Sequence, residues 1–461
     1  MSIGQSGSFT CRQSTLALFV LVALVPCAAA AQRPSESPIG DLEPQSPVGG
    51  HEAHQESSDS PQWRFMQDGV AFLTFNRQGG PRGDTEFVSQ NWWMGMGRRA
   101  VGTGTLTLTG MFSLEPATMR GDGYSEIFQT GEAFQGRAIT DRQHPHDLAM
   151  QLAGVWRVPI AGRTGFTIAG GPAGEATLGP VAFMHRASAA ENPFAPLGHH
   201  TFDSTHIAKG VVAMAVDHGP LVVEGSVFHG REPDEDRWNI SDVGALDSWA
   251  TRLWFRPGLE WEFQASHGYL HEPEELEPGS LRRTTVSASW MTQPNPDFSA
   301  ITVGYGLNDK DHTNVLFDAF FAESTYRSGP YAFYSRFEAA DVETELLLGA
   351  AEHDGGEGPP LRDTVVALTV GAVRDLPPLG GFEFGVGGDV TLHNVPERLV
   401  STHGARPVSF IVFLRVRPPV SSMGRMWNMT MTRPMTGLGS PAHGSVAQRI
   451  NRNPLRVSGT C

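Results

Sequence analysis

Two segments of the sequence concentrate side chains that could bind metal ions. Imidazole and carboxylate groups are usual ligands for zinc, copper and nickel, and histidines two residues apart, on either side of Pro145, could offer two nitrogens to one ion. The same groups could instead hydrogen-bond to one another and fix a loop, so both interpretations stay open. The candidate ligands are His144, His146 and Asp147 in the first segment and His185, His199, His200 and His206 in the second.

Methionines are concentrated near the C-terminus, around Trp427. Thioethers are soft ligands that suit Cu(I), so the cluster could bind that ion, although an extension without any ligand is the other interpretation. The methionines are Met423, Met426, Met429, Met431 and Met435.

Ser204 lies between Asp203 and His206, which suggests a hydrolase as an alternative function. A nucleophile and its base need a hydrogen bond and a third orienting group, and closeness in sequence supplies neither. No Gly-x-Ser-x-Gly turn surrounds this serine. We therefore expect no enzyme and assign no catalytic residue.

The segments that must position these residues alternate between apolar and polar side chains from Trp63 to about Arg417. In Leu259–Tyr269, every second residue is apolar or a histidine, and the residues between are charged, polar or small. A period of two is typical of strands with two different faces. The expected strands are 63–76, 85–98, 103–114, 148–158, 163–173, 207–217, 220–230, 247–257, 259–270, 281–292, 298–308, 313–325, 330–340, 362–375, 380–393 and 406–417.

Three features favour a membrane barrel over a soluble sandwich. The segments have about ten residues, the length with which a tilted strand crosses a bilayer. Tight turns alternate with long polar connections, and aromatic residues lie at segment ends, as an interfacial girdle requires. The sequence therefore predicts an all-β fold, an antiparallel transmembrane β-barrel of about 16 strands (roughly 14–18). The end aromatics are Trp63, Trp92, Trp93, Trp249, Tyr269, Trp290 and Tyr331.

The polar faces of the strands predict a charged lumen. Its charges could set the field that a permeating ion meets, or could form salt bridges that fill a narrow lumen. Two long connections, 115–147 and 174–206, could fold into the lumen or cover its mouth. The expected lumen-facing residues are Glu224, Arg252, Arg256, Glu260, Glu262, Arg283, Arg336, Glu338 and Arg415.

The N-terminus predicts export. Arg12 precedes an apolar run and then small residues up to Ala31, which is typical of a signal peptide over residues 1–31. Residues 32–62 have the composition of a disordered leader, 63–417 form the barrel, and 418–461 are expected to be a flexible, methionine-containing tail. No later stretch has the ~18 apolar residues of a membrane helix. We expect the protein in the outer membrane of a Gram-negative cell.

Composition excludes one class of partner. The formal net charge of −15 and the lack of clustered Lys and Arg argue against nucleic acid. The three cysteines, Cys11, Cys27 and Cys461, leave the body without a disulfide or a thiolate metal site. The expected partners are membrane lipid, small solutes or metal ions, and the barrel-assembly machinery.

Several motifs together resemble a family of largely uncharacterised Gram-negative proteins, predicted to be outer-membrane barrels and often associated with copper or heavy-metal resistance. The likeness covers most of 63–417 and implies location and a metal context, without catalytic or ligand residues to transfer. One departure is that some forty residues follow the last expected strand, Phe410–Arg417, where such barrels usually end on an aromatic residue. The motifs are Asn76–Gly83, Asp141–Asp147, Ala182–Arg186, Asp203–His206, His229–Asp234 and Leu246–Trp249.

Three functions therefore remain, in a fixed order. The leading hypothesis is a porin-like barrel that conducts or binds small solutes or metal ions. The second is a barrel that anchors a copper or zinc site, with no other cofactor expected, and the third is an outer-membrane hydrolase.

Overall fold

The computed structural model describes residues 62–130, 132–203, 208–239, 243–276, 279–292, 297–313, 315–349, 361–421 and 424–433. The expected signal peptide and all but the last residue of the expected leader lie outside these ranges. The largest sheet contains seventeen strands, of which β2 (Thr85–Val88) is a short strand beside β1. The other sixteen are β1 (Arg64–Arg77), β3 (Asn91–Val101), β4 (Gly104–Phe112), β9 (Ala149–Ala161), β10 (Thr164–Ala173), β11 (Lys209–His218), β12 (Leu221–His229), β13 (Ser248–Phe255), β14 (Trp261–Leu270), β15 (Leu281–Met291), β16 (Phe298–Lys310), β17 (Val315–Ser328), β18 (Tyr331–Glu343), β19 (Arg362–Leu379), β20 (Phe382–Asn394) and β21 (Val408–Arg417).

These sixteen strands close into a barrel. Each pairs antiparallel with the next, and the last, β21, pairs with β1 in a register that runs from Ala71 opposite Val416 to Arg77 opposite Phe410. Closure gives each of the sixteen described strands hydrogen-bonding neighbours on both sides, which removes the open edges of the sheet. The prediction of an all-β antiparallel barrel of about sixteen strands is confirmed.

The two faces of the sheet differ as the alternation predicted. In β13, Trp249, Leu253 and Phe255 are exposed on the outside, whereas Ser248 and Arg252 are buried inside. Exposed Val, Leu, Ile and Phe side chains recur on the outer face of nearly every strand. An apolar exterior of this extent is unfavourable in water and suits a lipid bilayer.

Two sequence expectations about single elements were wrong. The segment 85–98 is not one strand, because Ser89 and Gln90 separate β2 from β3 and the two strands pair with different halves of β1. Trp92 does not belong to an outer girdle, since it packs against buried methionines inside the barrel.

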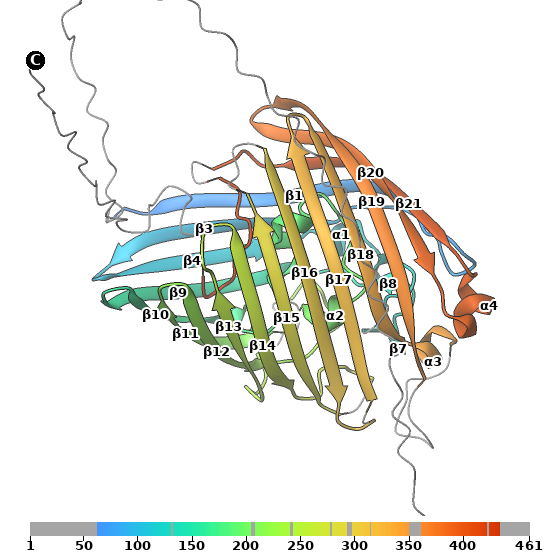
Figure 1. Cartoon of the computed structure of the whole chain (residues 1–461), viewed down its shortest axis with the longest axis horizontal. Coiled ribbons are helices and arrows are strands. Elements are labelled where there is room, and N and C mark those ends of the chain that lie inside the picture. Colours follow the sequence, from blue (N-terminus) through green and yellow to red (C-terminus); the bar gives the residue numbers. More distant parts are fainter. Residues whose placement is uncertain are drawn as a thin grey trace, which may run out of the picture. The chain divides into compact units, whose positions relative to one another are not determined.

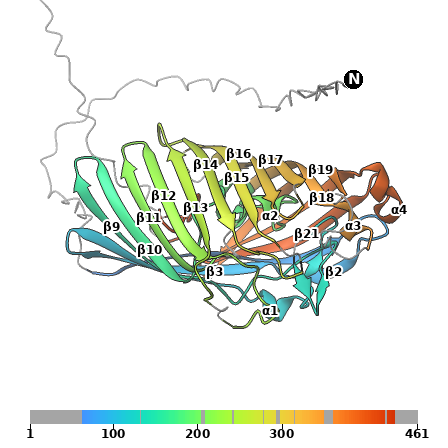
Figure 2. The same cartoon turned by 90° about the horizontal axis from the view of Figure 1, so that it is seen from below.

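The ends of the barrel differ in their connections (Figures 1 and 2). At one end neighbouring strands are joined by short turns, such as Ala161 to Thr164 and Leu379 to Phe382. The start of β1 and the end of β21 lie at this short-turn end, and the long connections lie at the other end. In the part of the chain that the structure describes, no helix is long and apolar enough to span a membrane.

The two long connections fold into the lumen. The short helix α2 (His199–Phe202) lies within the outline of the barrel in both views (Figures 1 and 2). The ring of Phe202 packs edge-on against the inward ring of Phe321 on β17, with centroids 4.8 Å apart. Aromatic packing of this kind explains why the segment 313–325 is apolar on both faces: one face meets the bilayer and the other meets the inserted chain.

Candidate functional site

The charged wall of the lumen is paired with the inserted segments. Arg252 binds Glu224 at 2.6 Å on the neighbouring strand and Glu175 at 3.0 Å from the second inserted segment. Buried charges need such partners, because an isolated ion loses its hydration without compensation. The geometry thus favours salt bridges that fill the lumen over charges that line open water. The structure places Glu224, Arg252, Arg256, Glu262, Arg283, Arg336, Glu338 and Arg415 inside the barrel.

The expectation for Glu260 was wrong. This residue lies in the turn before β14 and is exposed, and its carboxylate accepts a hydrogen bond of 3.3 Å from the outward indole of Trp290. The alternation was extended by one residue beyond the start of the strand, where a turn no longer keeps the period of two.

The most buried ion cluster centres on Glu191. Its carboxylate binds Arg415, Arg327 at 2.9 Å and Arg417 at 3.4 Å. Burial alone would raise the pKa of Glu191, but the three guanidinium groups outweigh it and lower the pKa to about 2. One carboxylate from the inserted chain therefore joins β17 and β21 electrostatically. Sequence reasoning missed it, because Glu191 lies in an irregular segment where no strand periodicity indicates its direction.

Wall side chains also satisfy the irregular backbone of the second inserted segment. The amide of Thr177 donates to Ser226 Oγ (3.0 Å), and that of Leu197 donates to Glu338 Oε1 (2.6 Å). Gly179 has φ of +82°, and a Cβ there would lie 2.1 Å from a backbone oxygen. A chain without its own ladder is stable in the lumen because the wall supplies its hydrogen-bond partners.

Part of the expected C-terminal tail also fills the lumen. Met426, Met429 and Met431 are buried, and the amide of Met431 donates to Glu175 Oε2 at 2.7 Å. Arg433 binds Glu262 on β14 at 2.7 Å. For residues 424–433 the expectation of a flexible extension was wrong, since ion pairs and buried side chains hold them. Met423 and Met435 lie outside the described residues.

Three of the expected metal ligands come together. One nitrogen each of His144, His199 and His200 lies within 4.8 Å of the others. Carboxylates surround them: Glu132 lies 3.1 Å from His144, and Glu232 lies 3.5 Å from His200. Tetrahedral zinc with Zn–N bonds of about 2.1 Å requires nitrogens roughly 3.4 Å apart, which side-chain rotation would have to provide. We call this group the histidine triad.

Burial and neighbouring charges perturb the carboxylate of Glu132. Burial raises its pKa well above the ordinary value, Arg237 opposes this, and Glu232 adds to the rise. Arg237 also binds Glu132 directly and Asp147 at 3.3 Å. Glu232 and Arg237 were not among the expected site residues. They lie in the connection after β12, and only the motif His229–Asp234 indicated that this stretch matters.

The other expected ligands lie apart from the triad. His146 Nδ1 contacts Glu115 Oε2 at 2.9 Å, and this carboxylate outweighs burial and raises the pKa of His146. Asp147 binds Lys209 at 2.8 Å. The expected use of His144 and His146 for one ion therefore does not match the geometry. His206, and Ser204 of the hydrolase alternative, lie outside the described residues.

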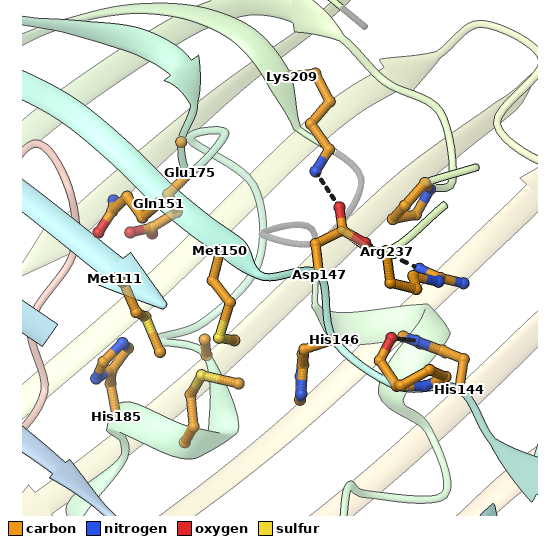
Figure 3. A pocket seen from close by; sticks show the side chains of 15 residues that line it. Met111, His144, His146, Asp147, Met150, Gln151, Glu175, His185, Lys209 and Arg237 are labelled. Atoms are coloured by element: carbon orange, nitrogen blue, oxygen red, sulfur yellow. Dashed lines mark hydrogen bonds and ion pairs between the residues drawn. The ribbon is translucent and has the colours of Figure 1, made fainter. Parts of the chain in front are cut away.

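A cavity of about 50 Å³ lies beside the triad, between the inserted segments and the wall (Figure 3). Its lining includes Met111, Met150, Met184, His146 and His185. A buried water needs only ~10–15 Å³ of such space, so the cavity is large enough for several waters or an ion.

Glu126 gives a testable pH dependence. Burial raises its pKa from 4.5 to about 8, nearby Glu338 adds to the rise, and Arg336 opposes it. The folded state therefore binds this proton more tightly than the unfolded state. Its stabilising effect is complete below pH 4.5 and is lost as the pH rises to 8, by up to about 1.4 kcal/mol per pH unit.

We therefore expect Glu126→Gln to be more resistant than wild type to thermal unfolding at pH 9, with a smaller difference at pH 5. Circular dichroism melts in detergent would measure it. Exposed Glu397→Gln is the control, and an equal difference at both pH values would contradict the assignment.

The chain resembles known proteins in structure rather than in sequence. No family model matches the sequence, and no curated protein matches it. Among solved structures, OprB of Pseudomonas putida has a TM-score of 0.48 at 10% identity, covering 77% of this chain and 94% of that one. An anion-selective porin of Comamonas acidovorans has 0.44 at 9%, covering 77% and 100%. OmpF of Salmonella typhi, in complex with daunomycin, has 0.45 at 10%, covering 77% and 97%.

The assignment of fold comes from this chain's own strand pairing. The sixteen long strands, their closure through β1 and β21, and the reversal of polarity between the two faces define the architecture. The protein is an all-β, closed, porin-like barrel of sixteen antiparallel strands whose lumen is filled by its own chain.

Proposed function

We propose that this protein is a porin-like channel of the Gram-negative outer membrane, with a lumen narrowed by its own inserted segments. The observation that carries the proposal is the closed sixteen-stranded barrel with an apolar outside and a charged inside. Only a closed sheet satisfies strand hydrogen bonds in lipid, and the outer membrane is where such barrels occur. The signal peptide expected over residues 1–31 supports export to that membrane.

The filling of the lumen limits what can pass. Arg252, Arg336 and Arg415 are almost fully buried under the inserted chain rather than hydrated. Charged groups in a narrow lumen select by charge and size, so small ions are the permeants that we expect. The motif resemblance to proteins associated with copper and heavy-metal resistance supports a metal ion as one such solute.

Planar bilayers test the channel. We expect the purified full chain to give discrete steps with a conductance well below that of an open sixteen-stranded porin measured in the same salt. Complete absence of steps, both in this chain and in the tail-truncated form treated in the Discussion, would overturn the channel proposal.

A second candidate function is supported by the histidine triad: a barrel that holds Zn²⁺ or Cu²⁺ near its long-connection end. Three imidazoles with two carboxylates beside them form a donor set that suits borderline metals. The triad residues come from two inserted segments, so an ion bound there would join both segments.

Metal titration of the purified protein tests this second candidate. We expect His144→Ala combined with His199→Ala to lower Zn²⁺ affinity by at least about tenfold, the lower end of what outer-shell changes alone cost. The matched control removes two histidines, His218 and His267, that bond to threonines on other strands. Equal affinity of the triad variant and wild type would remove the site.

A further inference from the structure

A second cluster of donor atoms lies in the lumen, and it is built from methionine. Eight of the 15 methionines in the chain take part, so the cluster does not follow from composition alone. They come from four strands, the second inserted segment and the tail. We call this group the methionine chamber: Met66, Met94, Met96, Met111, Met426 and Met429 are buried, and Met150 and Met184 pack against them.

His185 adds a nitrogen to the methionine chamber. The side chain is more than nine-tenths buried, and its Nδ1 has no hydrogen-bond partner among the described residues. It lines the same cavity as Met111, Met150 and Met184, and Figure 3 shows Met111, Met150 and His185 around one space. A buried nitrogen without a partner is costly, which indicates that something occupies that position.

Burial lowers the pKa of His185 to about 4, although Asp68 and Asp203 oppose the shift. The imidazole is therefore neutral at physiological pH, the form that binds metal. Asp68 and Asp203 are close enough to act on His185 through space, so the surroundings are electronegative and favour a cation. Trp92 lies edge-on to the imidazole, with ring centroids 5.0 Å apart, and shields that side of the ring.

The tail is fastened where its two buried methionines reach the chamber. The amide of Met426 donates to Asp68 Oδ2 at 2.7 Å, and the amide of Asn428 donates to the carbonyl of His185 at 2.8 Å. Asn428 Oδ1 accepts from the amide of Ala187 at 3.0 Å. These bonds hold Met426 and Met429 beside the segment that carries Met184 and His185.

Apolar packing alone would be served better by leucine or phenylalanine, whose rotamers are better defined. Methionine is flexible and polarizable, and its sulfur is a soft ligand selective for Cu(I). We propose that the methionine chamber, together with His185, binds one soft monovalent cation, Cu(I) or its redox-stable analogue Ag(I). The site is separate from the histidine triad, and it stands whether or not the lumen conducts.

The test uses the purified full chain in detergent, titrated with Ag(I) and, under anaerobic conditions, with Cu(I) against a competing chelator. We expect one equivalent bound, with sulfur and nitrogen neighbours in the X-ray absorption spectrum. Met111→Leu, Met150→Leu and Met184→Leu combined preserve volume and should lower the affinity by at least about tenfold. His185→Phe should remove the nitrogen signature.

Two control variants show whether binding depends on the methionine chamber itself. Met214→Leu changes an outward-facing methionine on β11 and should leave binding unchanged. The triad variant, His144→Ala with His199→Ala, should also keep Cu(I) binding. Circular dichroism melts identify variants that fail to fold. Failure of the wild type to compete with a weak chelator, or equal affinity in the folded triple leucine variant, would overturn the proposal.

Discussion

Truncation after Arg417 should increase the conductance of the barrel several-fold. The removed residues include Arg425, which binds Asp68 at 2.9 Å, and Thr432, which donates to Glu224. Without them, the short-turn end of the lumen loses its filling, and the carboxylates at that end become accessible to water. Because the newly exposed groups are acidic, we also expect the current to become more cation-selective.

Single-channel recording in planar bilayers measures this effect, with reversal potentials in a salt gradient for selectivity. The matched control is truncation after Arg433, which removes 434–461 only and keeps every described contact of the tail. The control should conduct like the full chain. Equal conductance of all three forms would show that the tail does not restrict the path.

Glu191→Ala should cause the largest loss of stability among single substitutions in the lumen. It would leave the guanidinium groups of Arg327, Arg415 and Arg417 buried close together without their shared carboxylate. Breaking a buried ion pair by removing one partner typically costs about 3–5 kcal/mol. Urea unfolding in detergent, followed by tryptophan fluorescence, gives the change in the free energy of unfolding.

Acid should have a related effect on the wild type. The folded-state pKa of Glu191, about 2, lies below its ordinary value of 4.5, so its contribution is complete above pH 4.5 and is lost as the pH falls toward 2. Glu191→Ala should therefore show a weaker acid dependence. Asp217→Asn, which breaks the largely exposed pair with Arg157, is the control and should change stability by less than about 1 kcal/mol. A small loss in Glu191→Ala would mean that water or another group replaces the carboxylate.

The barrel could be predicted from the sequence because each strand carries the information locally. In β13, Arg252 and Leu253 fall on opposite faces by the period of two alone, and no knowledge of distant residues is needed. The same rule failed at Glu260, where the strand has not yet begun. It also could not place Trp92, since an aromatic residue at a strand end suits either a lipid interface or a filled lumen.

The filling of the lumen could be predicted only in outline. The lengths of 115–147 and 174–206 indicated insertion, but the partners of the inserted chain are set by three-dimensional closure. Glu191 meets Arg415 across 224 residues, and Arg186 meets Glu323 across 137. No periodicity encodes such pairs. For the same reason the histidines could be named as candidate ligands, while the separation of His146 and His185 from the triad could not be foreseen.

The position of the tail after the final strand has a consequence for biogenesis. The tail follows β21 in the chain, and β21 is the strand that seals the cylinder against β1. The inserted connections can be enclosed while the sheet curls, but the tail can dock only from the short-turn side. Maturation therefore divides into sealing and a later docking step, and a synthetic peptide spanning 418–433 supplied to the truncated barrel should restore the narrow state.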